Sequence, residues 1–182
     1  RLAYSQMVVD LGYSKISENF TNQKAVLDNF LIVEKGEESN KTCAVLDVSQ
    51  GSPQVLLEPK YSQIDYLQRT ADFLVTSDKK KGIISSNKKT KVKLQYDDIQ
   101  LMDYEKKLYA VEISGKYGII DFNGAKVLDA DFSEIGIEIS DFKENDIRSK
   151  YIIADSLIPI RRDKEWAFFD VNGRQKTEFK YS

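Results

Sequence analysis

Two aspartates, Asp121 and Asp170, are the side chains whose types and spacing first suggest chemistry. A pair of facing carboxylates can hydrolyse a glycosidic bond. Both residues, however, recur with Asp47 at one position of a repeated phrase beside a turn, where aspartate commonly hydrogen-bonds to the backbone. The chain also has no histidine, which excludes Ser-His-Asp and Cys-His catalysis. We therefore expect no enzyme and no catalytic residue, and a hydrolase with a carboxylate pair is the least favoured alternative.

Residues that bind metals or cofactors are sparse. Histidine-containing zinc sites are excluded, and the chain has neither a Gly-rich phosphate loop nor a complete calcium loop. The single cysteine, Cys43, cannot form a disulfide within the chain. It stands at a repeat position that is aromatic in other copies, so we expect a small buried residue rather than a nucleophile. The sequence therefore predicts no cofactor and no metal site.

A lysine-rich segment is the clearest candidate for a ligand site. The candidate residues are Lys79, Lys80, Lys88, Lys89, Lys91 and Lys93. A turn at Asn87 and Lys88 would gather them near one edge, where they could bind a polyanion by displacing counterions. We favour the alternative of a solvated hairpin whose lysines discourage edge-to-edge pairing of strands. Because the net charge is -2, we expect no nucleic acid partner.

An internal repeat is the dominant pattern of the chain. Its clearest copies are Tyr117-Gly118-Ile119-Ile120-Asp121-Phe122-Asn123-Gly124 and Trp166-Ala167-Phe168-Phe169-Asp170-Val171-Asn172-Gly173. Looser copies open at Cys43 and Lys81, and an aromatic-x-x-Ile signature recurs at Tyr61, Tyr96 and Phe132. A fixed period indicates units that cannot bury their apolar faces alone and must pack on their neighbours.

Each repeat has the alternation of half-buried β-strands. Residues 91–96 and 109–114 alternate polar and apolar side chains, which is the period of a strand. The Asn-Gly pairs at 123–124 and 172–173 lie between apolar runs and predict type I′ hairpin turns, in which both central residues have positive φ. The phrase itself is apolar on both sides, which predicts a central strand. The small residue after each opener, such as Gly118, would let another backbone approach closely.

The third copy resembles the bacterial WG repeat. The match comprises Gly115-Lys116-Tyr117-Gly118-Ile119-Ile120-Asp121 and Asn123-Gly124, then Lys126-Val127-Leu128 and Phe132-Ser133-Glu134-Ile135. The tryptophan of the pattern is kept only at Trp166, and its glycine only at Gly82 and Gly118. The resemblance implies an array of short β units in bacterial proteins, often of the cell envelope or otherwise modular, with no established common chemistry. Because they recur at fixed repeat positions, we expect the signature residues, including Asp170, Asn172 and Gly173, to be structural.

We therefore predict an all-β fold of tandem antiparallel β-meanders of about 36 residues each. The sheets would form propeller-like blades, closed by a strand near Arg1 to Asp10, or alternatively an open stacked array. One WG-like domain would cover residues 1–182. Its repeats would span approximately 13–60, 61–95, 96–131 and 132–180, with an insertion at approximately 136–156.

The function that we expect from these features is a non-catalytic scaffold for protein–protein interaction. The alternative is a module that binds a glycan or cell-wall polymer through exposed tyrosine and tryptophan rings. The partner is accordingly another protein or a cell-wall polymer. No apolar run approaches the roughly 20 residues that a membrane-spanning helix needs. An extracellular or cell-envelope location is favoured over the cytoplasm.

Overall fold

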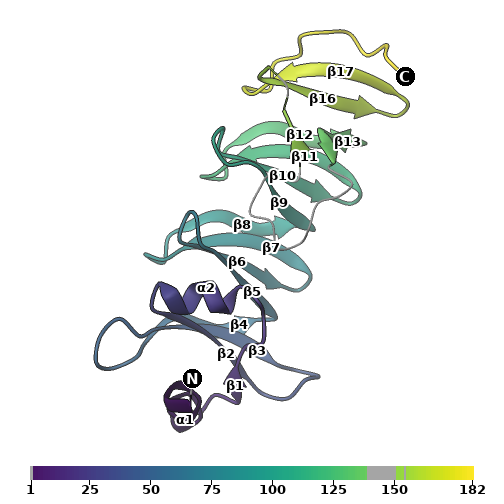
Figure 1. Ribbon diagram of the computed structural model, residues 1–182. Coiled ribbons are helices and arrows are strands. Elements are labelled where there is room, and N and C mark those ends of the chain that lie inside the picture. The colour runs from purple at the N-terminus through teal and green to yellow at the C-terminus, as the bar shows by residue number, and fades with distance from the viewer. Residues whose placement is uncertain (1, 139–150, 154) are drawn as a thin grey trace. The chain divides into compact units, whose positions relative to one another are not determined.

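A computed structural model of the chain describes residues 2–138, 151–153 and 155–182 (Figure 1). It is 54% strand and 8% helix, which confirms the predicted all-β class. The strands form four antiparallel sheets of three or four strands, and the described part contains no closed barrel. The chain divides into two compact units, Arg1–Leu94 and Gln95–Ser182. The predicted propeller closure and the single domain stay predictions.

Unit 1 contains two helices and two four-stranded sheets (Figure 1). Its first sheet and helices are α1 (Leu2–Asp10), β1 (Lys15–Ile16), α2 (Asn22–Leu27), β2 (Phe30–Lys35), β3 (Thr42–Asp47) and β4 (Gln54–Tyr61). Its second sheet is β5 (Gln63–Leu67), β6 (Asp72–Ser77), β7 (Lys80–Ser85) and β8 (Thr90–Tyr96), whose last two residues belong to unit 2. In both sheets the strands pair in the order of the sequence, as a meander requires.

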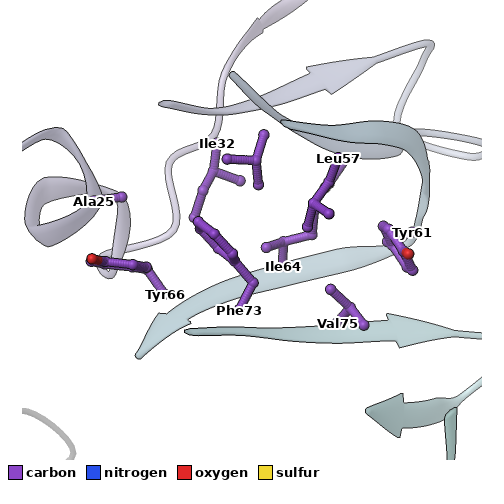
Figure 2. Packing of buried hydrophobic residues seen from close by; sticks show 10 residues of the cluster. Ala25, Ile32, Leu57, Tyr61, Ile64, Tyr66, Phe73 and Val75 are labelled. Atoms are coloured by element: carbon purple, nitrogen blue, oxygen red, sulfur yellow. The ribbon is translucent and has the colours of Figure 1, made fainter. Parts of the chain in front are cut away.

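The core of unit 1 lies between its two sheets. Figure 2 shows Ile32 and Leu57 of the first sheet meeting Ile64, Phe73 and Val75 of the second. All five side chains are buried. Since a sheet that is apolar on one face must cover that face, each meander stabilises the next by removing apolar area from water.

Unit 2 repeats this arrangement with one long connection. Its first sheet is β9 (Asp98–Asp103), β10 (Leu108–Ile113), β11 (Lys116–Asp121) and β12 (Lys126–Phe132). Its C-terminal sheet is β13 (Glu134–Ile135), β16 (Leu157–Arg162) and β17 (Glu165–Asp170). Two short strands, β14 (Ile137–Glu138) and β15 (Tyr151–Ile152), pair within the predicted insertion. The rest of the insertion, residues 139–150 and 154, lies outside the described residues.

The register of the repeats agrees with the sequence pattern. Three phrase openers lie opposite the aromatic residue that follows their repeat: Cys43 opposite Tyr61, Tyr117 opposite Phe132, and Trp166 opposite Tyr181. The phrase strands β3, β7 and β11 are central in their sheets, as predicted, whereas the phrase strand β17 is the last strand of its sheet, which differs from the prediction.

The glycine after an opener permits close contact between two backbones. Beside Gly118 the pairing of β11 with β12 is interrupted by a bulge, because Tyr117 faces Phe132 whereas Ile119 faces Leu128. A Cβ at Gly118 would lie 2.6 Å from the Leu128 carbonyl oxygen. The close approach predicted for this position is therefore confirmed.

The type I′ turns predicted at the Asn-Gly pairs are wrong. Gly124 has a φ of 84° and Gly173 of 82°, but neither Asn123 nor Asn172 has positive φ. Asp121 O accepts from Gly124 N at 3.0 Å, and Asp121 N donates to Ala125 O at 2.9 Å. This is a type I turn followed by a left-handed glycine, the usual geometry of a longer hairpin loop.

Positive φ at two successive residues occurs instead in the hairpin between β6 and β7 and in the hairpin between β10 and β11. The hairpin of β6 and β7 turns through Asp78 (φ 50°) and Lys79 (φ 64°), and that of β10 and β11 turns through Ser114 and Gly115 (φ 50° and 76°). These are the two-residue connections that type I′ turns make. In the β9–β12 sheet the two-residue turn therefore lies at the end of β11 opposite to the predicted type I′ turn.

The N-terminal strand predicted near Arg1 to Asp10 is also wrong, because Leu2–Asp10 is the helix α1. Val8 of this helix is fully buried against one face of the first sheet, where it packs with Leu31, Val33, Ala44 and Leu46. The opposite face of the same sheet packs on β5 and β6. The helix thus covers the face that a preceding meander would otherwise cover.

Candidate functional site

The recurrent aspartates serve the turns, as the hydrogen-bonding interpretation predicts. Asp121 Oδ1 accepts from the backbone N–H groups of Asn123 at 2.8 Å and Ala125 at 2.9 Å. Asp170 Oδ1 accepts equivalently from Asn172 and Arg174, both at 2.9 Å. The backbone N–H of Arg174 is the main reason that the pKa of Asp170 is lowered from its usual value. This arrangement favours a carboxylate that stays ionised in a turn.

Cys43 is buried, and its Sγ lies 3.7 Å from the carbonyl oxygen of Ser62. Burial raises the pKa of the thiol, and the nearby Glu34 carboxylate raises it further. A neutral, buried thiol is a poor nucleophile. Its position therefore agrees with the predicted role of a small core residue.

The candidate lysines do not gather at one edge. Lys79 and Lys80 lie at the hairpin of β6 and β7, whereas Lys88 and Lys89 follow the other end of β7. Since β7 has six residues, roughly 17 Å separates these ends. Lys88 Nζ lies 3.4 Å from the Val55 carbonyl oxygen.

Lys91 and Lys93 lie on β8, the last strand of its sheet. The Lys91 ammonium is 2.8 Å from a carboxylate oxygen of Asp72, whose side chain is 2% exposed. A buried carboxylate needs a nearby cation to offset the loss of its hydration. Lys91 therefore stabilises the buried carboxylate of Asp72. Lys93 is exposed.

The C-terminal sheet of unit 2 has two different faces. Opposed and alternate residues of a sheet share a side. Ile135, Ile160 and Ala167 therefore share the inner face, which packs on the β9–β12 sheet. Figure 1 shows the C-terminal tail (yellow) running beside β17, which is consistent with the bridge between Trp166 and Tyr181.

The other side bears Trp166, Phe168 and Tyr181, and we call it the outer aromatic face. The rings of Phe168 and Tyr181 lie 6.1 Å apart. The guanidinium of Arg161 lies 5.9 Å from the Trp166 ring, and its Nε donates to a Glu134 carboxylate oxygen at 2.9 Å. Cation–aromatic contact and the ion pair hold this row of side chains in place.

One residue of the outer aromatic face, Tyr181, is exposed where its counterparts are buried, while Trp166 and Phe168 are half-buried. Tyr181 is 45% exposed, whereas the equivalent Phe132 and Tyr61 are 5% and 4% exposed. Phe132 is buried within unit 2 because the inner face of the C-terminal sheet packs on it, with Phe169 in edge contact. The outer aromatic face thus has the residue pattern of an interface between meanders, but Tyr181 is not buried as the equivalent residue of such an interface is.

A second candidate is a hollow of about 600 Å³ in unit 1, lined by α1, α2 and the segment from β1 to Asn19. Its floor includes the buried Leu31, and its rim includes Tyr4 and Gln23. Sequence analysis missed this hollow because it predicted neither helix. The repeat phrase does not occur before Phe30, and this absence was the signal that the segment departs from the meander.

No protein-family model matches the chain, and a search of curated proteins also finds no significant match. Among the described residues, no group of three or more Cys, Asp and Glu side chains is placed to hold a metal ion. In the same part of the chain, neither helix combines the length and hydropathy that crossing a membrane requires.

Proposed function

We propose that this protein is a non-catalytic repeat scaffold that binds another protein through the outer aromatic face. The observation that carries the proposal is the 45% exposure of Tyr181 at a repeat position that is otherwise buried. Exposed aromatic side chains that are fixed in place are favoured anchors of protein interfaces, because they bury a large apolar area at a small cost in entropy.

The packing inside unit 2 supports a particular kind of partner. The face equivalent to the outer aromatic face is covered there by Ile158, Ile160 and Ala167 of a neighbouring sheet. We therefore propose a partner that presents an aliphatic β-sheet face with a small central residue. Three short strands and the tail segment beside β17 offer an area of roughly 20 by 20 Å, well below the roughly 800 Å² per partner of a standard interface. The expected affinity is accordingly micromolar.

The test is site-specific photo-crosslinking followed by quantitative binding. A benzophenone side chain at Phe168 should give a defined protein adduct in cells, whereas the same group at Ile113, which is 37% exposed in unit 2, should not. The purified partner should then lose at least tenfold in affinity for Phe168→Asp. Equal adducts from both positions, or unchanged affinity of the variant, would refute the proposed surface.

A glycan or cell-wall polymer is the second candidate partner. It is favoured by the neighbouring rings of Trp166 and Tyr181, which lie opposite each other on adjacent backbone segments. Because Trp166 is the only tryptophan, its fluorescence reports directly on this surface. A saturable change on titration with polysaccharide, together with retention on a polysaccharide gel, would favour this candidate over the protein partner. Unchanged fluorescence without retention would exclude it for the polymers tested.

Membership of the WG repeat family, and a place in the bacterial envelope, are part of the same proposal. The support is the pairing of three openers with a downstream aromatic, as at Tyr117 and Phe132. Detection of the protein in the envelope fraction of its cells would agree with the location, and recovery only with cytoplasmic markers would contradict it. A hydrolase is not favoured, since Oδ1 of both Asp121 and Asp170 serves its turn.

A further inference from the structure

The hollow in unit 1 has the features of a small ligand site rather than of a gap in packing. Its volume of about 600 Å³ falls within the range of roughly 300–1,000 Å³ typical of ligand pockets. The apolar part of its lining is Ile16, Val26 and Leu31. Leu31 is fully buried, and Val26 is 38% exposed, so the lining runs from a closed floor to an open rim.

The polar lining separates into fixed and available groups. Asn22 and Asn19 are fixed, because their amides bond to the backbone of Ser17 and Ile32 and to Ile64 and Asp65. The side chains of Tyr4 from α1 and Gln23 from α2 make no hydrogen bond to any residue that the structure describes. A hydroxyl and a primary amide, which can both donate and accept, therefore remain available on two different elements.

The charge of the lining limits the ligand further. Among the described residues of the lining, Glu18 is the only carboxylate; it is 87% exposed and lies 3.7 Å from the Lys15 ammonium. The described lining contains no lysine or arginine. Among these residues an anion would find no counter-charge, and a cation would find only a carboxylate that is exposed and already paired.

We propose that the hollow binds a small neutral ligand that carries several hydroxyl groups beside an apolar face, of the size of a mono- or disaccharide. The Tyr4 hydroxyl and the Gln23 amide bond to the ligand hydroxyls, while Ile16 and Val26 contact its apolar face. This site lies in unit 1 and shares no residue with the outer aromatic face. It therefore stands or falls independently of the proposed protein interaction.

The experiment is a titration of the full chain with cellobiose and N,N′-diacetylchitobiose, followed by NMR. At least one of the two should give saturable shifts of the amides of Ser5, Ser17 and Gln23. Tyr4→Ala and Gln23→Ala should each weaken this binding at least fivefold. Phe168→Asp serves as the matched control and should leave it unchanged, because that residue lies on the outer aromatic face.

A charged probe gives the second arm. Glucuronate should bind at least fivefold more weakly than glucose, because none of the described lining residues carries a positive charge. Circular dichroism of Gln23→Ala should match that of the parent chain, since this exposed side chain supports no other group. The proposal is overturned if neither disaccharide shifts these amides, if glucuronate binds as well as glucose, or if folded Tyr4→Ala and Gln23→Ala both retain the parent affinity.

Discussion

Asn22→Ala should destabilise the protein by more than the loss of one ordinary side-chain hydrogen bond would. Strand β1 has only two residues and pairs with Val33 and Glu34 of β2. Beyond its end, Asn22 acts in place of a strand: its Oδ1 accepts from the backbone N–H of Ile32 at 3.0 Å, and its Nδ2 donates to the carbonyl oxygen of Ser17 at 3.1 Å.

The magnitude follows from burial. Ile32 is fully buried, so its N–H would have no partner in the variant, at a cost of about 1–3 kcal/mol. Ser17 O is only partly buried and loses one donor, which adds at most about 0.5 kcal/mol. We expect a total loss of about 2–3 kcal/mol, a large fraction of a typical stability of about 5–15 kcal/mol.

Urea unfolding followed by far-ultraviolet circular dichroism measures this loss, with hydrogen exchange of the Ile32 amide as a local readout. Tryptophan fluorescence is unsuitable, because Trp166 lies in unit 2. Gln23→Ala is the control, because it also changes α2 but removes an exposed side chain, and should cost under about 0.5 kcal/mol. If Asn22→Ala is as mild as the control and leaves Ile32 exchange unchanged, Asn22 does not complete the sheet edge.

Three further predictions concern the framework. Gly118→Ala should lower the free energy of urea unfolding by about 2 kcal/mol or more, because the new Cβ meets backbone atoms of β12. The control, Gly51→Ala, should be neutral because the space around Gly51 is open. Equal stability of the two variants would contradict this prediction. Lys91→Ala should cost about 3 kcal/mol by leaving the buried Asp72 carboxylate without its cation, and a loss under about 1 kcal/mol would show that the pair is dispensable. Cys43 should resist iodoacetamide at about pH 8 in the folded chain and should react after unfolding. Burial raises the pKa of the thiol above its ordinary value of about 8.5, so that the folded thiol stays neutral. Rapid labelling of the folded chain would show an accessible thiolate.

Sequence analysis predicted the strands and their pairing because both depend on local patterns. The alternation in residues 91–96 and 109–114 fixes which side chains face a core, and a shift by one residue would turn them to solvent. The distance from opener to aromatic then fixes which residues pair, as at Trp166 and Tyr181. The turn type could not be predicted in this way, because Asn-Gly occurs in several types of loop. The side chain of Asp121 stabilises the loop that is observed.

The helices and the hollow between them could not be predicted for a different reason. Helix α2 has six residues, less than two turns, so no helical period can be seen in it. Of the residues of α1 whose burial is described, only Val8 is buried, so this helix also lacks an extended apolar stripe. Both form because the first sheet offers a face and an edge that need cover, and tertiary packing of this kind overrides weak local preference.

The first sheet of unit 1 and the C-terminal sheet of unit 2 differ in how their apolar faces are covered. In a repeat fold an apolar sheet face is stabilised when a neighbouring element covers it. At the first sheet α1 covers one face, where Val8 is buried and Met7 packs beside it. At the C-terminal sheet of unit 2 the outer aromatic face bears Trp166, Phe168 and Tyr181, and Tyr181 remains exposed. A face that only needed to be soluble would bear polar residues at these positions. Retention of Trp166, Phe168 and Tyr181 there is the reason to seek the partner on the outer aromatic face.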